Sequence, residues 1–188
     1  MRNPYKLLTP KQKEDWIRAL GRLEETNIQI FDDAGQTVPE MRAKARKVIK
    51  QHPDKKPIIF IDYLTLIPSV ESYGGNRHQQ ITEISWDLKL MAKDFDCPVI
   101  LLAQLNRSVE NRQDKRPTLA DLRESGSIEQ DANNVFFLYR DSYYNEKADN
   151  DDLEIIVAKQ RNGPIGTVRT RYNKHTGEIL DEYGQTAI

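Results

Sequence analysis

The chain has 188 residues, of which 38% are hydrophobic, and these values predict one globular domain spanning residues 1–188. Lys plus Arg (28) nearly balances Asp plus Glu (29), which excludes the overall basic field of many nucleic-acid-binding proteins. The single cysteine, Cys97, excludes a disulfide framework and a thiol cluster for zinc.

Membrane insertion and secretion are also excluded by the sequence pattern. No apolar run approaches the roughly 20 residues needed to cross a bilayer. The first residues lack the apolar core of a secretory signal. We therefore expect a soluble protein of the reducing cytoplasm.

The first third of the chain predicts two helices and a short strand. Thr9-Pro10-Lys11-Gln12 has the form of a capping box with proline at the first helical position, and predicts a helix through Leu23. A short strand is expected at Ile28–Phe31, closed by a turn at Gly35. Thr37-Val38-Pro39-Glu40 repeats the capping pattern before a helix that extends to Gln51. The many Lys and Arg residues of that helix indicate a solvated outer face.

A run of apolar residues, Ile58-Ile59-Phe60-Ile61, leads directly into Asp62. A continuous apolar run without alternation is typical of a strand covered on both faces, as in a parallel α/β sheet. Ligands of such sheets bind outside the carboxyl ends of the strands, where Asp62 would meet a metal ion or a phosphate. From this segment alone, an Asp that only caps the following loop is an equally good explanation.

A second apolar strand, Cys97–Ala103, ends in the same way at Gln104. Between the two strands, apolar residues at helical spacing from Ile81 to Phe95 predict a long helix that packs on the sheet. If the strands are neighbours, Asp62 and Gln104 lie side by side at one sheet edge. A carboxylate beside an amide suits a nucleotide with Mg²⁺. Alternatively, Gln104 is only a polar residue at a strand boundary.

The last third of the chain predicts a strand at Val135–Tyr139, an acidic loop over residues 141–152, and a hairpin. The hairpin consists of Leu153–Lys159 and Thr167–Tyr172 around a turn at Asn162-Gly163-Pro164. Together with the earlier elements, this pattern predicts a three-layer α/β domain. Its sheet is expected to be mostly parallel, with the antiparallel hairpin at one edge.

Lys159 and Arg161 are two residues apart at the hairpin, so the spacing places both cations on one side of it. A lysine and an arginine brought together in this way suit the oxygens of a phosphate. An exposed basic hairpin that only aids solubility is the alternative.

The segment Asp121–Asp131 combines a glycine and small hydroxyls with charges, and predicts a polar loop entering a helix. Arg123, with the main-chain amides of Gly126 and Ser127, would suit contact with a phosphodiester backbone without reading bases. The alternative is a network of charged groups that satisfy one another and cap the helix.

Four blocks in this order resemble the C-terminal, RecA-like motor domain of the DnaB-type replicative DNA helicases. The similarity is strongest in these blocks and extends from about Leu8 to Tyr172, with residues 173–188 as a tail. The blocks are Ile61–Ile67, Ala103–Glu110, Asp114–Asp131 and Ala158–Val168.

The resemblance implies a P-loop NTPase fold and a role for each matching residue. Asp62 would act on Mg²⁺ through water, and Gln104 would sense the phosphate of ATP. Lys159 and Arg161 would reach across a subunit interface to the γ-phosphate bound by the next subunit. Arg123, Glu124 and Gly126 would belong to a loop that grips single-stranded DNA. The family forms hexameric rings that use ATP to move 5′-to-3′ and unwind DNA, with a primase and a helicase loader as partners.

One feature of the family is not found in the chain. The sequence contains no G-x-x-x-x-G-K-[ST] phosphate loop and no Gly-Lys pair. We therefore expect the chain to be the distal part of a helicase motor, incomplete at its N-terminal side, with negligible ATPase activity by itself. Two other functions remain open at this point: a RecA-like recombinase-type ATPase, and a non-enzymatic module that binds a helicase ring or loader.

Overall fold

The computed structural model describes residues 7–71, 73–145 and 151–181. The chain divides into two compact units, one ending at Ala34 and one beginning at Gly35. The described part of the first unit is dominated by helix α1 (Pro10–Glu24). The predicted capping box is present: the amide of Gln12 donates to Thr9 Oγ1 at 3.3 Å, and the amide of Thr9 donates to Gln12 Oε1 at 2.9 Å. None of the residues of helix α1 is buried.

The strand predicted at Ile28–Phe31 is not present, and that prediction was wrong. The segment has no regular structure, and Ile28, Ile30 and Phe31 are exposed. A strand is defined by hydrogen bonds to a neighbour, and none of the strands in the described ranges pairs with this segment.

The second unit alternates helices and strands. Its first elements are helix α2 (Val38–Gln51), strand β1 (Ile59–Ile61), helix α3 (Arg77–Asp94) and strand β2 (Val99–Leu101), with a 3₁₀ helix η2 (Leu64–Leu66) after β1. The chain continues with the 3₁₀ helices η3 (Arg107–Asn111) and η4 (Leu119–Ser125), and then helix α4 (Gly126–Asp131). Its last elements are β3 (Asn134–Tyr139), α5 (Asp141–Tyr144), β4 (Asp152–Gln160), β5 (Gly166–Tyr172) and β6 (Ile179–Leu180). Across the ranges described, no helix combines the length and hydrophobicity that a membrane span requires.

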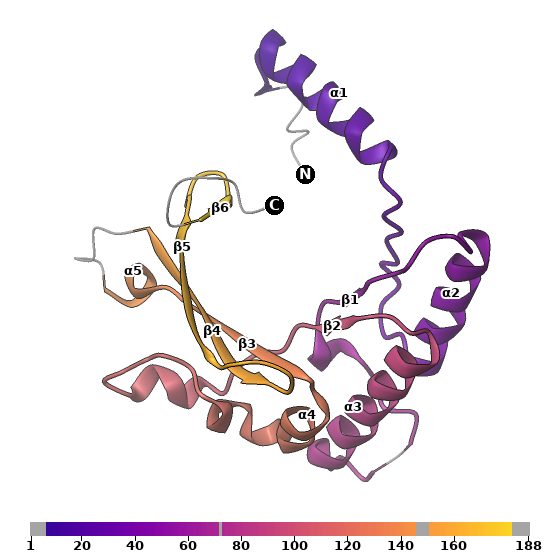
Figure 1. The fold of residues 1–188 in the computed structure, drawn as a ribbon, viewed down its shortest axis with the longest axis vertical. Coiled ribbons are helices and arrows are strands. Elements are labelled where there is room, and N and C mark those ends of the chain that lie inside the picture. Colours follow the sequence, from indigo (N-terminus) through magenta and orange to yellow (C-terminus); the bar gives the residue numbers. More distant parts are fainter. Residues whose placement is uncertain (1–6, 72, 146–150, 182–188) are drawn as a thin grey trace. The chain divides into compact units, whose positions relative to one another are not determined.

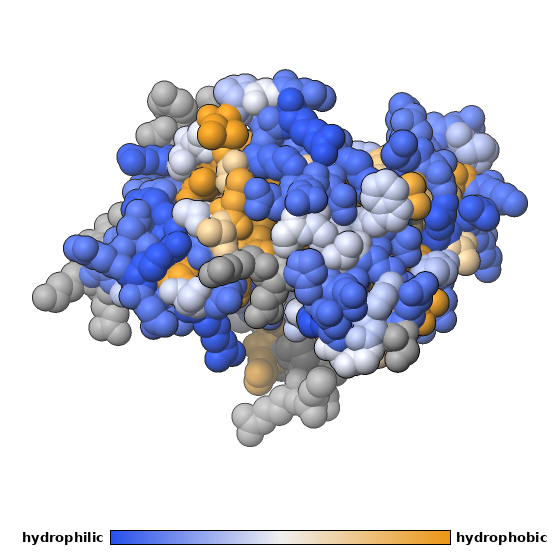
Figure 2. Space-filling view, turned by 90° about the horizontal axis from the view of Figure 1, so that it is seen from below, coloured by the Kyte–Doolittle hydropathy of each residue, from blue (hydrophilic) through white to orange (hydrophobic). Residues whose placement is uncertain are grey.

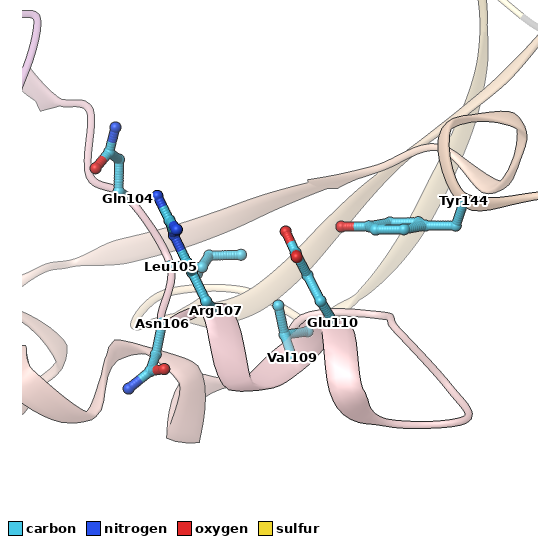
Figure 3. Close-up of a pocket in the computed structure, with 7 residues that line it drawn as sticks. All are labelled: Gln104, Leu105, Asn106, Arg107, Val109, Glu110 and Tyr144. Carbon is cyan, nitrogen blue, oxygen red and sulfur yellow. The ribbon is translucent and has the colours of Figure 1, made fainter.

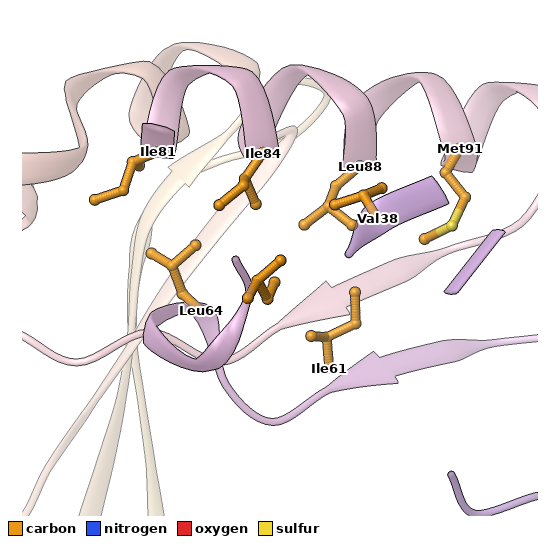
Figure 4. Close-up of a cluster of buried hydrophobic side chains, with 8 residues drawn as sticks. Val38, Ile61, Leu64, Ile81, Ile84, Leu88 and Met91 are labelled. Atoms are coloured by element: carbon orange, nitrogen blue, oxygen red, sulfur yellow. The ribbon is translucent and has the colours of Figure 1, made fainter. Parts of the chain in front are cut away.

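Strands β1 and β2 pair in parallel, with Ile61 opposite Leu101. Helix α3 covers one face of this pair, and the predicted apolar stripe is confirmed: Ile84 is 1% exposed and Met91 is fully buried. Figure 4 shows these side chains pointing from α3 toward Ile61 and Leu64. The buried cluster consists of Val38, Ile61, Leu64, Ile67, Ile81, Ile84, Leu88 and Met91. It holds β1 in place, and therefore the residue that follows it.

The remaining strands form a separate antiparallel sheet in the order β3-β4-β5-β6 (Figure 1). The predicted hairpin is confirmed as β4 and β5, and the chain turns again before β6. The sequence predicted one mostly parallel sheet, whereas β3 pairs antiparallel with β4. Only alternate residues of β3 are buried, because its second face is not covered. The predicted α/β class is confirmed.

Candidate functional site

Asp62 and Gln104 follow two neighbouring strands, as predicted. The amide of Leu102 donates to the carbonyl of Ile61 at 3.0 Å, and the amide of Leu64 donates to the carbonyl of Leu102 at 2.9 Å. The parallel register of β1 and β2 therefore continues to their carboxyl ends, so both residues lie at the same edge of the sheet.

The side chain of Asp62 is exposed at this edge. Within the ranges described, the Asp62 carboxylate accepts no hydrogen bond and forms no ion pair, so the loop-cap explanation has no support there. The Gln104 side chain is exposed as well. A carboxylate and an amide left open at the end of a parallel sheet can both accept a ligand from solvent.

Gln104 also contributes to a pocket of about 300 Å³ (Figure 3). In this view Arg107 and Glu110 point into the space that Gln104 borders, and the Tyr144 hydroxyl points toward Glu110. Burial, and then the negative charge of Glu110, raise the pKa of Tyr144. The lining residues are Gln104, Leu105, Asn106, Arg107, Val109, Glu110 and Tyr144.

Sequence reasoning did not assign Glu110 or Tyr144 to a site. Glu110 lies on the 3₁₀ helix η3, six residues after Gln104, and no pattern in that segment predicts a role for it. Tyr144 lies on α5, after the third strand, and its position beside η3 depends on how the chain folds back. No local sequence signal brings these two segments together.

Lys159 and Arg161 point to the same side of the hairpin, as their spacing predicts. Lys159 Nζ donates to the main-chain carbonyls of Glu129 and Gln130, and Arg161 Nη2 donates to the Gln130 carbonyl at 2.9 Å. These carbonyls belong to the last turn of α4, where no intrahelical donor remains for them. The cation pair therefore caps the C-terminal end of α4, which is the end that favours positive charge.

The hairpin is held beside α4 by the main chain as well. The amide of Arg161 donates to the carbonyl of Asn133 at 3.0 Å, immediately beyond the β3–β4 ladder. Over the described ranges, neither Lys159 nor Arg161 forms an ion pair with a carboxylate. Two cations whose charge is not neutralised by a neighbouring carboxylate can attract an anion.

Helix α4 and the residues that follow it are fixed to α3 by polar contacts. Ser85 Oγ on α3 donates to Asp131 Oδ2 at 2.7 Å, and Lys89 Nζ donates to Asn133 Oδ1. Ile128 packs against the main buried cluster. The end of α4 that accepts hydrogen bonds from Lys159 and Arg161 is therefore anchored to α3, the helix that also packs on β1.

The predicted loop before this helix is a 3₁₀ helix, η4, which runs directly into α4 at Gly126. The side chains of Arg123 and Glu124, both candidates for DNA contact, lie outside what the structure describes. Gly126 has φ −54°, an ordinary helical conformation.

For Asp121 the structural-network explanation holds. Asp121 Oδ2 accepts from the Thr118 amide and from Arg112 Nη2, each at 2.8 Å, and the Asp121 side chain is only 6% exposed. Burial opposes ionisation of Asp121, but these hydrogen bonds outweigh it and lower the pKa of the carboxyl. Asp121 therefore caps η4 as a charged group and is not free to bind a ligand.

The described segments contain no group of three or more His, Cys, Asp or Glu residues that could hold a metal ion. A hard cation such as Mg²⁺ needs only one carboxylate from the protein when phosphate and water supply its other ligands. The exposed carboxylate of Asp62 at the strand end fits that requirement.

Comparison with known proteins identifies the family. The profile of the family described as "DnaB-like helicase C terminal domain" matches residues 3–181. The chain is 48% identical to the replicative DNA helicase DnaB of Geobacillus stearothermophilus over 178 residues, which are 93% of this chain and 38% of that protein. It is 48% identical to the replicative DNA helicase DnaC of Bacillus subtilis over 90% of this chain and 38% of that protein.

Comparison with solved structures identifies the same family. One solved ATPase domain superimposes with a TM-score of 0.85 at 46% identity, over 89% of this chain and 60% of that domain. A DnaB-like replicative helicase studied for its interactions with primase gives the same TM-score and identity, over 42% of its chain. These matches favour the replicative helicases over the recombinase-type ATPases. The chain spans less than two fifths of the length of these curated relatives, and it belongs to the DnaB-like helicase C-terminal domain family.

Proposed function

We propose that this chain forms part of the motor of a hexameric replicative helicase. That motor couples ATP hydrolysis to 5′-to-3′ movement along single-stranded DNA and to unwinding of the duplex. The observation that carries the proposal is the parallel pairing of β1 and β2, which puts Asp62 and Gln104 at one open sheet edge in a chain of this family.

At that edge, Asp62 orients the water shell of the Mg²⁺ that accompanies ATP, and Gln104 hydrogen-bonds to the terminal phosphate or to the attacking water. The bound Mg²⁺ supplies charge neutralisation for the phosphates. Support comes from the open position of both side chains and from the pocket beside Gln104. The chain contains no phosphate-loop sequence, so these residues are only part of a nucleotide site.

Lys159 and Arg161 act on the nucleotide held by the next subunit of the ring. A lysine and an arginine presented together provide point charge and bidentate hydrogen bonding for the γ-phosphate. Because the cations come from a different subunit, hydrolysis depends on the position of that subunit. In this structure both side chains donate hydrogen bonds to a main-chain carbonyl at the end of α4.

Arg123, Glu124 and Gly126 contribute to the contact with single-stranded DNA. Gly126 is the junction of η4 and α4, so a DNA strand held there lies on the helix whose other end accepts hydrogen bonds from Lys159 and Arg161. A primase and a helicase loader are the expected protein partners of the complete ring. Support for the primase is that one matching structure describes a DnaB-like helicase with its primase interactions.

The test uses a chimera in which this chain replaces the matched region of the Geobacillus stearothermophilus helicase. The Arg161→Ala variant should lose at least about 10³-fold of DNA-stimulated ATP hydrolysis, which is the scale of a lost arginine finger. Nucleotide binding should change less than about threefold. Arg171→Ala, at an exposed arginine of β5, is the matched control and should retain hydrolysis. Equal loss of binding and hydrolysis in Arg161→Ala would contradict the trans-acting role.

The unmodified chain provides a second test. Without a phosphate loop it should neither hydrolyse ATP nor bind it tightly. Isothermal titration with ATP and Mg²⁺ measures this directly. Tight, Mg²⁺-dependent binding by the chain alone would overturn the assignment of Asp62 and Gln104 as one part of a larger site.

A further inference from the structure

Two side chains of α3 hold the short segment between α4 and β3. Ser85 Oγ donates to Asp131 Oδ2 at 2.7 Å, and Lys89 Nζ donates to Asn133 Oδ1. Ser85 and Lys89 are four residues apart, so they lie on one side of α3 and one turn from each other. Figure 1 shows α4 beside α3. The helix therefore contacts this segment at two points.

The same segment holds Arg161 at the end of the β3–β4 ladder. The amide of Arg161 donates to the carbonyl of Asn133 at 3.0 Å, and its guanidinium donates to the carbonyl of Gln130 at 2.9 Å. The ladder has a register shift between Val135 and Phe136, close to this end. Because a bulge disrupts the ladder, the position of Arg161 depends more strongly on contacts from outside the strands.

Helix α3 also supports the other candidate site residue. Its buried residues Leu88 and Met91 pack with Ile61, the last residue of β1, as Figure 4 shows. Asp62 follows directly. In the proposed function Asp62 serves the nucleotide site of its own subunit, whereas Arg161 serves the site of the next one. A single helix therefore connects the residues that one subunit contributes to two sites.

We propose that Asn133 is a positioning residue for Arg161, with Lys89 as its anchor on α3. The side chain of Asn133 accepts a hydrogen bond from α3, and its carbonyl accepts one from the Arg161 amide. The position of α3 is thereby transmitted to the trans-acting cation. This role rests on the proposed function of Arg161 at the γ-phosphate of the next subunit. A misplacement of about 1 Å can cost about 10²-fold in rate, so loss of the link should slow hydrolysis.

The hydrogen bond between Lys89 and Asn133 is separable from folding. Asn133 is exposed and Lys89 is half-buried, and most of the face seen in Figure 2 is hydrophilic. Water competes for a hydrogen bond at such a surface, so its net contribution to stability is small. The variant Asn133→Ala should therefore fold.

The first test measures the link in this chain by amide hydrogen exchange. The Arg161 amide should exchange at least about tenfold faster in Asn133→Ala and in Lys89→Met, because its acceptor is no longer held on α3. The double variant should exchange no faster than either single variant, as expected for two members of one contact. Asn134→Ala, at the exposed neighbouring residue, is the matched control and should not change the exchange. Unchanged exchange in Asn133→Ala and Lys89→Met would overturn the proposal.

The second test measures DNA-stimulated ATP hydrolysis in the chimera with the Geobacillus stearothermophilus helicase. Asn133→Ala should lower kcat at least about tenfold and change KM for ATP less than about threefold. Asn133→Asp keeps an acceptor for Lys89 and should restore kcat, and Asn134→Ala should have no effect. If Arg161→Ala retains hydrolysis, the proposed function fails. If Arg161→Ala loses hydrolysis but Asn133→Ala does not, only the positioning role fails.

Mixed rings test whether Asn133 acts on the site of the next subunit. Subunits with Asp62→Asn lack the carboxylate of their own site but provide a correctly held Arg161, and subunits with Asn133→Ala provide the reverse. Rings assembled from both variants should hydrolyse more ATP than the average of the two separate variants, because some neighbours then form an intact site. No gain on mixing would mean that Asn133 acts only within its own subunit, and would contradict the proposal.

Discussion

Lys159 and Arg161 converge on one oxygen atom, the main-chain carbonyl of Gln130, with donor–acceptor distances of 3.2 and 2.9 Å. This carbonyl is part of the C-terminal turn of α4, whose first residue, Gly126, is a candidate for DNA contact. A phosphate that binds the same cations competes with these hydrogen bonds. The proposed DNA contact and the proposed γ-phosphate contact therefore lie at the two ends of one short helix.

The first prediction concerns the capping role of Lys159. Lys159→Met keeps the apolar stem but removes the donors to Glu129 and Gln130, so it should lower the free energy of unfolding by about 1 kcal/mol. Urea denaturation followed by circular dichroism measures the change. Lys47→Met, at an exposed lysine of α2 before its last turn, should change stability by less than about 0.5 kcal/mol. If the two variants are equally stable, the cap contributes nothing to folding.

The second prediction concerns Arg123 in the chimera. If Arg123 contacts a phosphate, Arg123→Ala should weaken single-stranded DNA binding for all sequences. It should also reduce the slope of log K against log salt concentration by about 0.7, the value for one lost contact to a single strand. Fluorescence anisotropy at several salt concentrations measures both effects. An unchanged slope would favour a purely structural role for this arginine.

The third prediction concerns the pH dependence of stability. Hydrogen bonds from Arg116, at 2.7 and 2.8 Å, lower the pKa of Glu154 despite its partial burial, and the pKa of Asp121 is also lowered. A carboxyl with a lowered folded-state pKa stabilises the fold above its unfolded-state pKa. That contribution is lost as the pH falls through the folded-state value.

The urea midpoint should therefore stay nearly constant from pH 7 to about pH 5 and fall below the ordinary carboxyl pKa values of 3.8 and 4.5. Glu154→Gln should cost about 1–2 kcal/mol at pH 7, because it removes the charge from a hydrogen-bonded ion pair. The difference from the unmodified chain should shrink as the pH falls below about 4. A difference that stays constant down to pH 3 would contradict the role of the Glu154 charge.

The fourth prediction tests the buried cluster that supports β1. Ile84 is 1% exposed, so Ile84→Ala should leave a cavity and lower the free energy of unfolding by about 2–5 kcal/mol. Trp86→Ala, on the exposed side of the same helix, should cost much less. Chemical denaturation of both variants gives the comparison. Similar losses would mean that this side of α3 does not hold the core.

Features that depend on a few consecutive residues could be predicted from the sequence. The capping boxes at Thr9 and Thr37 are stabilised by hydrogen bonds three residues apart, and both helices begin where expected. The apolar runs that end at Asp62 and Gln104, and the turn after Gln160, are local patterns as well. The shared edge of Asp62 and Gln104 followed because parallel neighbours present their carboxyl ends together.

Features that depend on distant partners required the tertiary structure. Ile28–Phe31 has the composition of a strand, but a strand forms only when another strand supplies its hydrogen bonds. The contact of Lys159 and Arg161 with Gln130 joins residues about 30 positions apart, and no spacing in the chain encodes it. The exposed apolar side chains of both sheets also became visible only in the fold. The sequence by itself determined where the helix caps lie, which residues favour a strand and which are candidate ligands, because those preferences are local. Tertiary structure decided which of them meet and which apolar side chains of the described residues are exposed, because pairing and burial depend on contacts between distant segments.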